Sequence, residues 1–235
     1  MRVFFSCILF LGLIALLGQS VFAEQSVFTE KSNKAKTVKL MALTGDEEFA
    51  DNQFAWDKTY ARSDFVFGKD PAPFLTKFIK ILPKGRALDI ATGEGRNAVY
   101  LAKKGFLVDG VDISSVGLRK AQKLAAENGV KIRTINADLN KYRIKTDHYT
   151  VILNFYYLQR NLFPQIKTGL KKGGILVFET NTTDQLKIPG KNNWEKDFLL
   201  EPGELKQAFS DFEILHYAET NDGKNAIASL VAKKR

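Results

Sequence analysis

Cysteine and histidine are scarce in this 235-residue chain, which has one cysteine, Cys7, and two histidines. A single cysteine cannot form an intramolecular disulfide or a cysteine metal site, so a disulfide scaffold and a mechanism with a cysteine nucleophile are excluded. His148 and His216 have no partner at a metal-ligand spacing, and no metal is expected. Hydrophobic residues make up 45% of the chain, which excludes disorder as the main state and suffices for one sizeable core.

An apolar run, residues 3–18, follows Arg2 and precedes a small-residue site that ends at Ala23. This order is typical of a secretory signal peptide, and the run is shorter than the roughly 20 residues that span a bilayer. Residues 1–23 are therefore predicted to be a signal peptide, so that the protein is exported to the periplasm or secreted. The alternative is a membrane anchor through residues 3–18 with a cytoplasmic folded domain, because lysines that follow the run outnumber Arg2.

Residues 24–52 are polar and lack sustained periodicity, which predicts a linker. Beyond residue 71, helical and strand patterns alternate, as in a parallel sheet covered by helices. Strands are predicted over 86–91, 106–112, 131–136, 149–155, 175–180, 212–219 and 226–232, and helices over 74–82, 97–103, 114–127 and 163–170, with a last helix that has Pro202 in its first turn. The final two strands form an antiparallel hairpin. The predicted fold is α/β, a Rossmann-like seven-stranded, mostly parallel sheet with one antiparallel strand and helices on both faces.

A glycine loop follows the first predicted strand. The segment ALDIATGEGRNAVYLAKKG places Asp89 at the end of the strand, Gly93 and Gly95 in the turn, and a helix directly afterwards. Glycines let the backbone approach a ligand, and the helix N-terminus offers free amide donors. Asp112 ends the second strand, where a carboxylate can accept both hydrogen bonds of a ribose diol. A nucleoside ligand is therefore expected.

Charge distinguishes between two nucleoside cofactors. The spacing of Gly93, Gly95 and Ala98 also fits NAD-binding enzymes, but that spacing alone is weak evidence. Asp89 and Glu94 would face an anionic pyrophosphate, and like charges at ~4 Å repel by several kcal/mol at an effective dielectric near 20. S-adenosylmethionine carries a sulfonium and an ammonium and no phosphate, so an acid-rimmed loop favours it.

Four segments together resemble the class I S-adenosylmethionine-dependent methyltransferases, within them the small tellurite-resistance-like branch. The segments are WDKTYARSDFVFGKDPAPFL, LDIATGEGRNAVYLAKKGFLVDGVDISSVGLRKA, NADL and LKKGGILVFET. The resemblance implies one methyltransferase domain over residues 53–235. It also implies that Asp89 and the loop backbone hold the methionine end of S-adenosylmethionine, Asp112 the ribose, and Asp138 the adenine amino group. The first loop glycine of the family is Ala91 here, which is compatible with a turn that keeps a negative φ at this residue.

The full set of predicted cofactor-binding residues is Trp56, Tyr60, Asp89, Ala91, Gly93, Gly95, Asn97, Asp112, Ile113, Asp138, Leu139, Asn154 and Phe155. Several of these assignments have a structural alternative. Asp112 could cap the helix that follows Ser114, and Asp138 could form an Asx-turn. Trp56 and Tyr60 either pack in the core or cover the ligand as a lid.

The predicted function is transfer of a methyl group to a small-molecule acceptor, because the folded part leaves little room for a separate recognition domain. Tyr156, Tyr157 and Arg160 are the candidate catalytic residues, since acceptors bind after the fourth strand in related folds; packing is their alternative. The chain has 35 Lys and Arg against 26 Asp and Glu. An excess of basic residues alone indicates only non-specific attraction to acidic partners, so nucleic acid is disfavoured as a specific partner. The alternatives are a non-catalytic protein that binds S-adenosylmethionine or a nucleoside and, less favoured, an NAD-dependent oxidoreductase.

Overall fold

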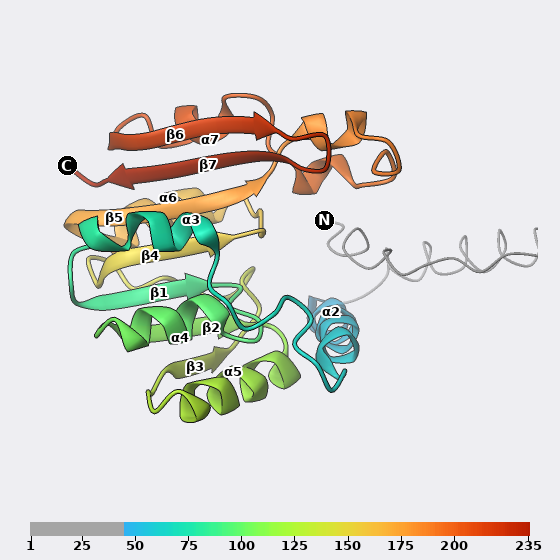
Figure 1. The fold of residues 1–235 in the computed structure, drawn as a ribbon, viewed down its shortest axis with the longest axis vertical. Helices are drawn as coiled ribbons and strands as arrows, with labels where there is room; N and C mark the ends of the chain where they lie inside the picture. The colour runs from blue at the N-terminus through green and yellow to red at the C-terminus, as the bar shows by residue number, and fades with distance from the viewer. Residues whose placement is uncertain (1–44) are drawn as a thin grey trace, which may run out of the picture.

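The computed structural model describes residues 45–235 (Figure 1). The helices are α2 (Gly45–Tyr60), α3 (Pro73–Phe78), α4 (Arg96–Lys103), α5 (Ser115–Glu127), α6 (Leu162–Gly169) and α7 (Glu204–Ala208), and the 3-10 helices are η1 (Ile79–Ile81), η2 (Thr183–Lys187) and η3 (Lys196–Phe198). The strands are β1 (Arg86–Ile90), β2 (Leu107–Asp112), β3 (Arg133–Asn136), β4 (Tyr149–Phe155), β5 (Leu170–Asn181), β6 (Glu213–Asn221) and β7 (Ala226–Lys233).

The predicted N-terminal signal peptide or anchor, residues 1–23, and the candidate membrane attachment through residues 3–18 lie outside the described residues. Among residues 45–235, no helix combines the length and apolar composition that crossing a bilayer requires.

The seven strands form one sheet in the order β3-β2-β1-β4-β5-β7-β6. Strands β1 to β5 pair in parallel, whereas β7 runs antiparallel to β5 and to β6. This confirms the predicted Rossmann-like sheet with one antiparallel strand. Because the parallel strands end at the same edge of the sheet, the loops after β1, β2 and β4 meet there.

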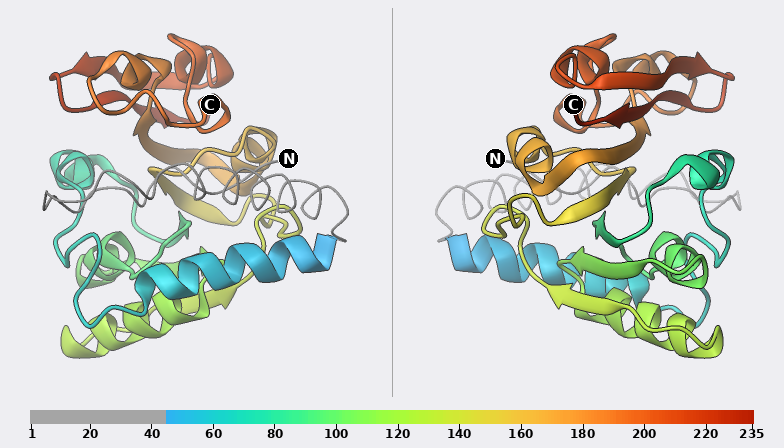
Figure 2. Two further views of the ribbon diagram at one scale, coloured as in Figure 1. Left: turned by 90° about the vertical axis from the view of Figure 1, so that its right-hand side faces the viewer. Right: turned by 90° about the vertical axis from the view of Figure 1, so that its left-hand side faces the viewer.

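Successive residues of the central strands supply two apolar cores, one on each face of the sheet. Ile152 of β4 packs in the core that includes α6 and α7, whereas Val151 and Leu153 pack in the core that includes α3 and α4. Helices therefore cover both faces, as predicted (Figures 1 and 2). In the left view of Figure 2, α2 lies across the carboxyl ends of the strands in front of α5.

The predicted linker over residues 24–52 extends too far, because α2 begins at Gly45 and makes residues 45–52 helical. Polar contacts help to hold this helix, and periodicity in the sequence did not indicate its first two turns. The Asp57 side chain of α2 accepts hydrogen bonds from Ser114 Oγ at 2.6 Å and from Val116 N at 3.0 Å, at the start of α5. These bonds satisfy α5 donors that lack partners within that helix.

Two further boundaries differ from the prediction. β5 begins at Leu170, where a helix was expected to end, because Leu170 pairs with Tyr149 of β4. Helix α7 begins at Glu204, so Pro202 precedes the helix and does not lie in its first turn. Between them stands Gly203, whose φ of +76° breaks the helical path.

Candidate functional site

The loop between β1 and α4 contains left-handed residues at alternate positions, with φ of +52° at Ala91, +54° at Gly93 and +82° at Gly95. The expectation that Ala91 keeps a negative φ is wrong, and its left-handed conformation costs about 1 kcal/mol for a residue with a Cβ. At Gly93 a Cβ would lie 2.7 Å from the Tyr60 hydroxyl oxygen. Glycine at 93 therefore allows both the turn and the close approach of α2.

Asp112, the last residue of β2, joins the glycine loop to the start of α5. Its Oδ2 accepts the Gly93 N–H at 2.7 Å, and its Oδ1 accepts the Ser114 N–H at 2.8 Å. Burial raises the pKa of Asp112 to about 6, although these backbone hydrogen bonds oppose the rise. Each carboxylate oxygen has a second lone pair, so the structural role leaves capacity to accept ribose hydroxyls.

Asp89 lies in β1 and is only 2% exposed. Burial raises its pKa to about 7, and the hydrogen bond that Thr92 Oγ1 donates to Oδ2 at 2.7 Å opposes the rise. The charge of Arg96 also lowers the pKa of Asp89, and the charge of Asp112 raises it. Within the described chain neither aspartate forms an ion pair, so a cationic ligand would stabilise both carboxylates.

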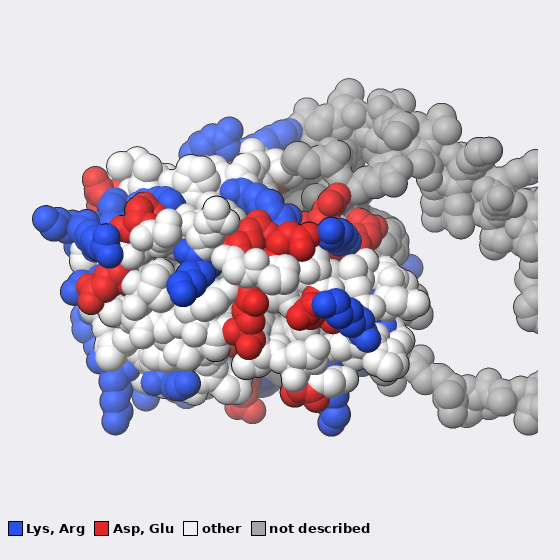
Figure 3. Space-filling model, turned by 90° about the horizontal axis from the view of Figure 1, so that it is seen from above, with Lys and Arg blue, Asp and Glu red and all other residues white. Residues whose placement is uncertain are grey.

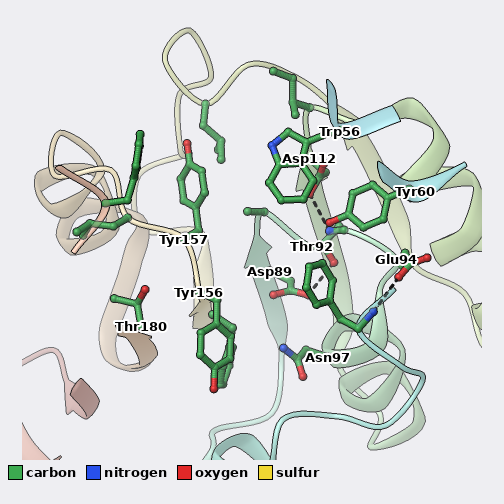
Figure 4. A pocket seen from close by; sticks show the side chains of 18 of the residues that line it. Trp56, Tyr60, Asp89, Thr92, Glu94, Asn97, Asp112, Tyr156, Tyr157 and Thr180 are labelled. Carbon is green, nitrogen blue, oxygen red and sulfur yellow. Dashed lines mark hydrogen bonds between the residues drawn. The ribbon is translucent and has the colours of Figure 1, made fainter. Parts of the chain in front are cut away.

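The loops at this edge surround a cavity of about 510 Å³, within the usual range for small-molecule sites (Figure 4). Thirteen of the predicted binding and catalytic residues line it: Trp56, Tyr60, Asp89, Ala91, Gly93, Asn97, Asp112, Ile113, Asp138, Leu139, Phe155, Tyr156 and Tyr157. In Figure 4, the two α2 aromatics lie on one side, and the tyrosines that follow β4 lie on the other. The structure thus brings together residues that are up to about a hundred positions apart.

The α2 wall of the cavity consists of aromatic rings. Trp56 and Tyr60 are stacked, with ring centroids 5.5 Å apart. Tyr60 is buried and packs so closely on Gly93 and Gly117 that a Cβ on either would lie within 3.0 Å of its side chain. These aromatics therefore both pack on the glycine loop and line the cavity, which combines the two alternatives left open by the sequence.

Asp57 is a positioning residue that the sequence did not indicate. Burial raises its pKa, but hydrogen bonds from Ser114, Val116 and Ser115 outweigh this effect and leave the pKa below its ordinary value. The ionised carboxylate thus fixes α2, and with it Trp56, against the start of α5.

Glu94 does not act as the charge argument supposed. Its Oε1 pairs with Lys120 Nζ at 2.7 Å, and its Oε2 accepts the Val66 N–H at 2.8 Å. The side chain is almost fully buried, so Glu94 holds the loop after α2 against α5. The preference for a cationic ligand therefore depends on the buried carboxylates Asp89 and Asp112, neither of which forms an ion pair within the described residues.

Three predicted site residues lie outside the cavity. Gly95 precedes α4, and a Cβ there would lie 2.6 Å from the Cβ of Ala121, so this glycine allows α4 and α5 to pack closely. Asn154 is buried within β4, and its Nδ2 donates to the Tyr157 carbonyl. Arg160 instead contacts the segment that follows β5.

The tyrosines after β4 are held by neighbouring polar groups. Tyr156 has a φ of +55°, and its backbone N–H and its hydroxyl donate to the backbone oxygen and Oε1 of Glu179 at 2.8 and 2.9 Å. Tyr157 donates its hydroxyl to Gln159 Oε1. Burial raises the pKa of both tyrosines, so each acts as a neutral phenol. The strained Tyr156 backbone is a common feature of functional sites.

Asp138 shows the Asx-turn that the sequence left as its alternative. Its Oδ1 accepts the Asn140 N–H at 2.8 Å, and the residue also lines the cavity beside Leu139. The turn therefore presents Asp138 at the cavity and does not remove it from the site.

Part of the cavity was not predicted from the sequence. The additional lining residues include Asn52, Phe67, Thr92, Arg96, Asn140, Leu158, Thr180, Asn181, Trp194, Phe198 and Asn225. Some lie beside predicted positions within the quoted motifs, so adjacency could have identified them. Trp194 and Phe198 lie in a stretch without periodicity, and only the fold brings them to the site.

Arg96 is the one lysine or arginine among the described residues that line the cavity. In Figure 3, Lys and Arg crowd the left end of the molecule, where the C-terminus lies in Figure 1. That end carries the amino ends of the parallel strands, with exposed Lys171 and Lys172 at β5 and Lys233 at the end of β7. Within residues 45–235, no three potential metal-binding side chains gather into a metal site.

Residues 72–225 match the family model described as tellurite resistance protein TehB. The chain belongs to the TehB family. This confirms the predicted class I S-adenosylmethionine-dependent methyltransferase of the tellurite-resistance-like branch, and with it S-adenosylmethionine as the cofactor of the family. A probable S-adenosyl-L-methionine-dependent methyltransferase TehB of Haemophilus influenzae is 26% identical over 174 residues, which are 66% of this chain and 59% of that protein. The chain thus spans about three-fifths of the length of that relative.

Solved structures share the fold. The crystal structure of TehB from Haemophilus influenzae has a TM-score of 0.60 at 21% identity, and the match covers 78% of this chain and 67% of that one. Geranyl diphosphate C-methyltransferase from Streptomyces coelicolor A3(2), solved with S-adenosyl-L-homocysteine, has a TM-score of 0.56 at 15% identity over 68% of this chain and 79% of that one. The TehB-family chain described here therefore has the methyltransferase fold.

Proposed function

We propose that this protein transfers a methyl group from S-adenosylmethionine to a small-molecule acceptor. The observation that carries the proposal is the pair of buried carboxylates, Asp89 and Asp112, that flank the glycine loop without an ion-pair partner in the described chain. Burial disfavours their charge, and a ligand with a sulfonium and an ammonium compensates it. A dinucleotide pyrophosphate would add negative charge to the same loop.

The residues present fit this cofactor. Asp89 and the amides of the glycine loop would hold its amino-acid end, Asp112 its ribose, and Asp138 with Leu139 its adenine. When bound, S-adenosylmethionine supplies a methyl group on a positively charged sulfur, which needs no further activation. The stacked rings of Trp56 and Tyr60 form an apolar wall on this half of the cavity.

Calorimetric titration tests the proposal at its first step. We expect S-adenosylmethionine to bind and NAD not to bind. A methyl-transfer screen over thiols, amines and chalcogen oxyanions then tests turnover, and tellurite is included because of the family description. Binding with no methylated product from any class would instead indicate a non-catalytic binding protein, and NAD binding alone would contradict the proposal.

We also propose that residues 1–23 direct export of the protein. The order of Arg2, the apolar run over residues 3–18 and the small-residue site at Ala23 supports this proposal. N-terminal sequencing of the expressed protein together with cell fractionation tests it, and the expected N-terminus is Glu24 in the exported fraction. An intact N-terminus in the membrane fraction would support the anchor alternative.

A further inference from the structure

The cavity is closed on one side by the segment that follows β5, residues 182–203, here called the cap segment. Its backbone is fixed to the sheet at both ends. Thr182 N–H donates to the Ala226 carbonyl at 3.0 Å, Thr183 N–H to the Leu200 carbonyl at 2.8 Å, and Leu200 N–H to the Asn181 carbonyl at 3.0 Å. The cap segment is thus a formed wall of the site.

Arg160 holds one part of the cap segment from outside the cavity. Its Nε and Nη2 pair with the Glu204 carboxylate at 2.6 and 2.8 Å. Its Nη1 and Nη2 also donate to the carbonyls of Asp197 and Leu199, at 2.8 and 2.9 Å. These two residues flank Phe198, so Arg160 positions the Phe198 ring while its own charge is neutralised.

Lys191 holds the other part in a similar way. Its Nζ donates to Asn225 Oδ1 at 3.0 Å and to the Lys224 carbonyl. The same Nζ lies 5.6 Å from the ring centroid of Trp194, which is a cation–π contact. Lys191 itself is not among the residues that line the cavity, whereas Trp194 and Asn225 are.

The cap end of the cavity combines aromatic rings with uncharged polar side chains. Its lining residues are Tyr156, Thr180, Asn181, Trp194, Phe198 and Asn225. Arg96 is the one cation among the lining residues that the structure describes, and its Nη1 donates to the Phe67 carbonyl at 3.1 Å. A small oxyanion needs several positive or N–H donors once its water is removed, and Arg96 is the single cation that the described lining supplies.

We propose that the methyl acceptor is a neutral small molecule with an apolar ring, and that the ring lies against Trp194 and Phe198. The hydroxyl of Thr180 and the amide of Asn225 line the same cavity and provide polar groups for a substituent of the acceptor. This inference rests on the proposed function, because it assigns the second substrate of the same site. The aromatic rings and the single cation of the described lining favour such an acceptor over a chalcogen oxyanion.

The two tryptophans of the chain allow the two halves of the site to be monitored separately, because Trp56 lies on α2 and Trp194 on the cap segment. In the variant Trp194→Phe, the fluorescence of the remaining Trp56 monitors the cofactor half of the site. In Trp56→Phe, the fluorescence of the remaining Trp194 monitors the cap half. In Trp194→Phe, we expect S-adenosylhomocysteine to change the emission of Trp56. In Trp56→Phe saturated with S-adenosylhomocysteine, we expect phenylmethanethiol to change the emission of Trp194 and selenite to leave it unchanged.

The inference would be overturned if phenylmethanethiol left the Trp194 emission unchanged, or if only selenite changed it. In either case, a response of Trp56 to S-adenosylhomocysteine would leave the proposed function intact. No response of Trp56, together with no heat in the calorimetric titration of wild type, would instead remove the proposed function and the inference with it.

Turnover provides a second measurement on the unmodified protein. Phenylmethanethiol and 2-mercaptoethanol present the same nucleophile with and without a ring. Each turnover joins the methyl carbon to the thiol sulfur, returns the bonding electrons to the sulfonium sulfur and releases the thiol proton to solvent. We expect kcat/KM to be roughly tenfold or more higher for the ring-bearing thiol, the scale of one aromatic contact.

Phe198→Ala tests the assignment of this preference to the cap segment. We expect it to abolish the preference, and the control Phe54→Ala to retain it, because Phe54 is 70% exposed on α2 and does not line the cavity. Equal kcat/KM for the two thiols in wild type, or faster methylation of tellurite or selenite than of either thiol, would overturn the inference.

Discussion

The buried Asp89 predicts that cofactor affinity depends on pH in a range where most aspartates are fully ionised. Its pKa is about 7, because burial outweighs the hydrogen bond from Thr92. The cationic end of S-adenosylmethionine favours the ionised form, so protonation of Asp89 competes with binding. Affinity is therefore expected to fall as the pH is lowered through 7.

The size of the effect follows from this pKa. A carboxyl with a pKa of about 7 is ionised in roughly 3% of molecules at about pH 5.5 and in roughly 75% at about pH 7.5. If binding requires the carboxylate, the association constant rises by roughly 25-fold over this interval. The ammonium of the cofactor stays protonated through most of it, since α-amino groups titrate near pH ~8.

The variant Asp89→Asn isolates this contribution. The amide oxygen can still accept the Thr92 hydroxyl, so the loop is expected to keep its structure while it loses the charge. We expect affinity at about pH 7.5 to fall by about 1.5–3 kcal/mol, the scale of a hydrogen bond to a charged group. The pH dependence should shrink to the roughly fourfold change that Asp112, with a pKa of about 6, contributes over the same interval. Calorimetric titrations across the interval measure both quantities.

Asp211→Asn is the matched control, because Asp211 is an exposed carboxylate that pairs with Lys167 away from the cavity. It should retain the affinity and the pH profile of wild type. A wild-type dissociation constant that does not change between about pH 5.5 and 7.5, or an Asp89→Asn variant that keeps the slope, would refute the role assigned to Asp89.

Three further substitutions test other parts of the site and its support. Asp112→Ala should lower affinity for S-adenosylmethionine by about 1.5–3 kcal/mol in calorimetry, and unchanged affinity in a folded variant would exclude Asp112 from the site. Gly95→Ala should lower the Tm, because the new Cβ would clash with Ala121. The dissociation constant of the folded variant should stay near that of wild type. A loss of affinity without a loss of stability would show that Gly95 belongs to the cofactor site. Asp109→Asn should reduce the free energy of unfolding by about 2 kcal/mol, since the fully buried Asp109 carboxylate pairs with Arg133, whose side chain is half exposed; chemical denaturation measures it, and a change below ~0.5 kcal/mol would contradict it.

Local chemistry made much of the cofactor half predictable. A helix was expected over residues 114–127, and α5 begins there, capped by Ser114, whose Oγ accepts the Gly117 N–H. Apolar runs bounded by turn residues similarly predicted the strands, because a parallel strand is buried on both faces. The acids at the strand ends could be identified because a strand end, a glycine turn and a helix start lie within one short segment.

The same local reasoning failed where a residue serves distant partners. Arg160 follows β4 and was therefore assigned to the acceptor, yet its guanidinium binds Glu204 and backbone carbonyls of the cap segment. Helix α2 was partly assigned to a linker because the Asp57 contacts that hold it lie more than fifty residues further along the chain. Hydrophobic periodicity and motif spacing in the sequence do not predict such long-range hydrogen bonds.

The two halves of the cavity therefore differ in whether their lining residues can be identified from short sequence motifs. The cofactor half is built from residues within single motifs, where Gly93, Asp112 and Ser114 bond to one another across adjacent strand ends. The cap half depends on Arg160 and Lys191, which place Phe198 and Trp194 from outside the cavity. Substitutions in the cap segment can change the lining of the acceptor end without altering the bonds that shape the glycine loop. Family membership consequently indicates the cofactor that the family shares, whereas the proposed acceptor rests on the residues that this chain places on its cap segment.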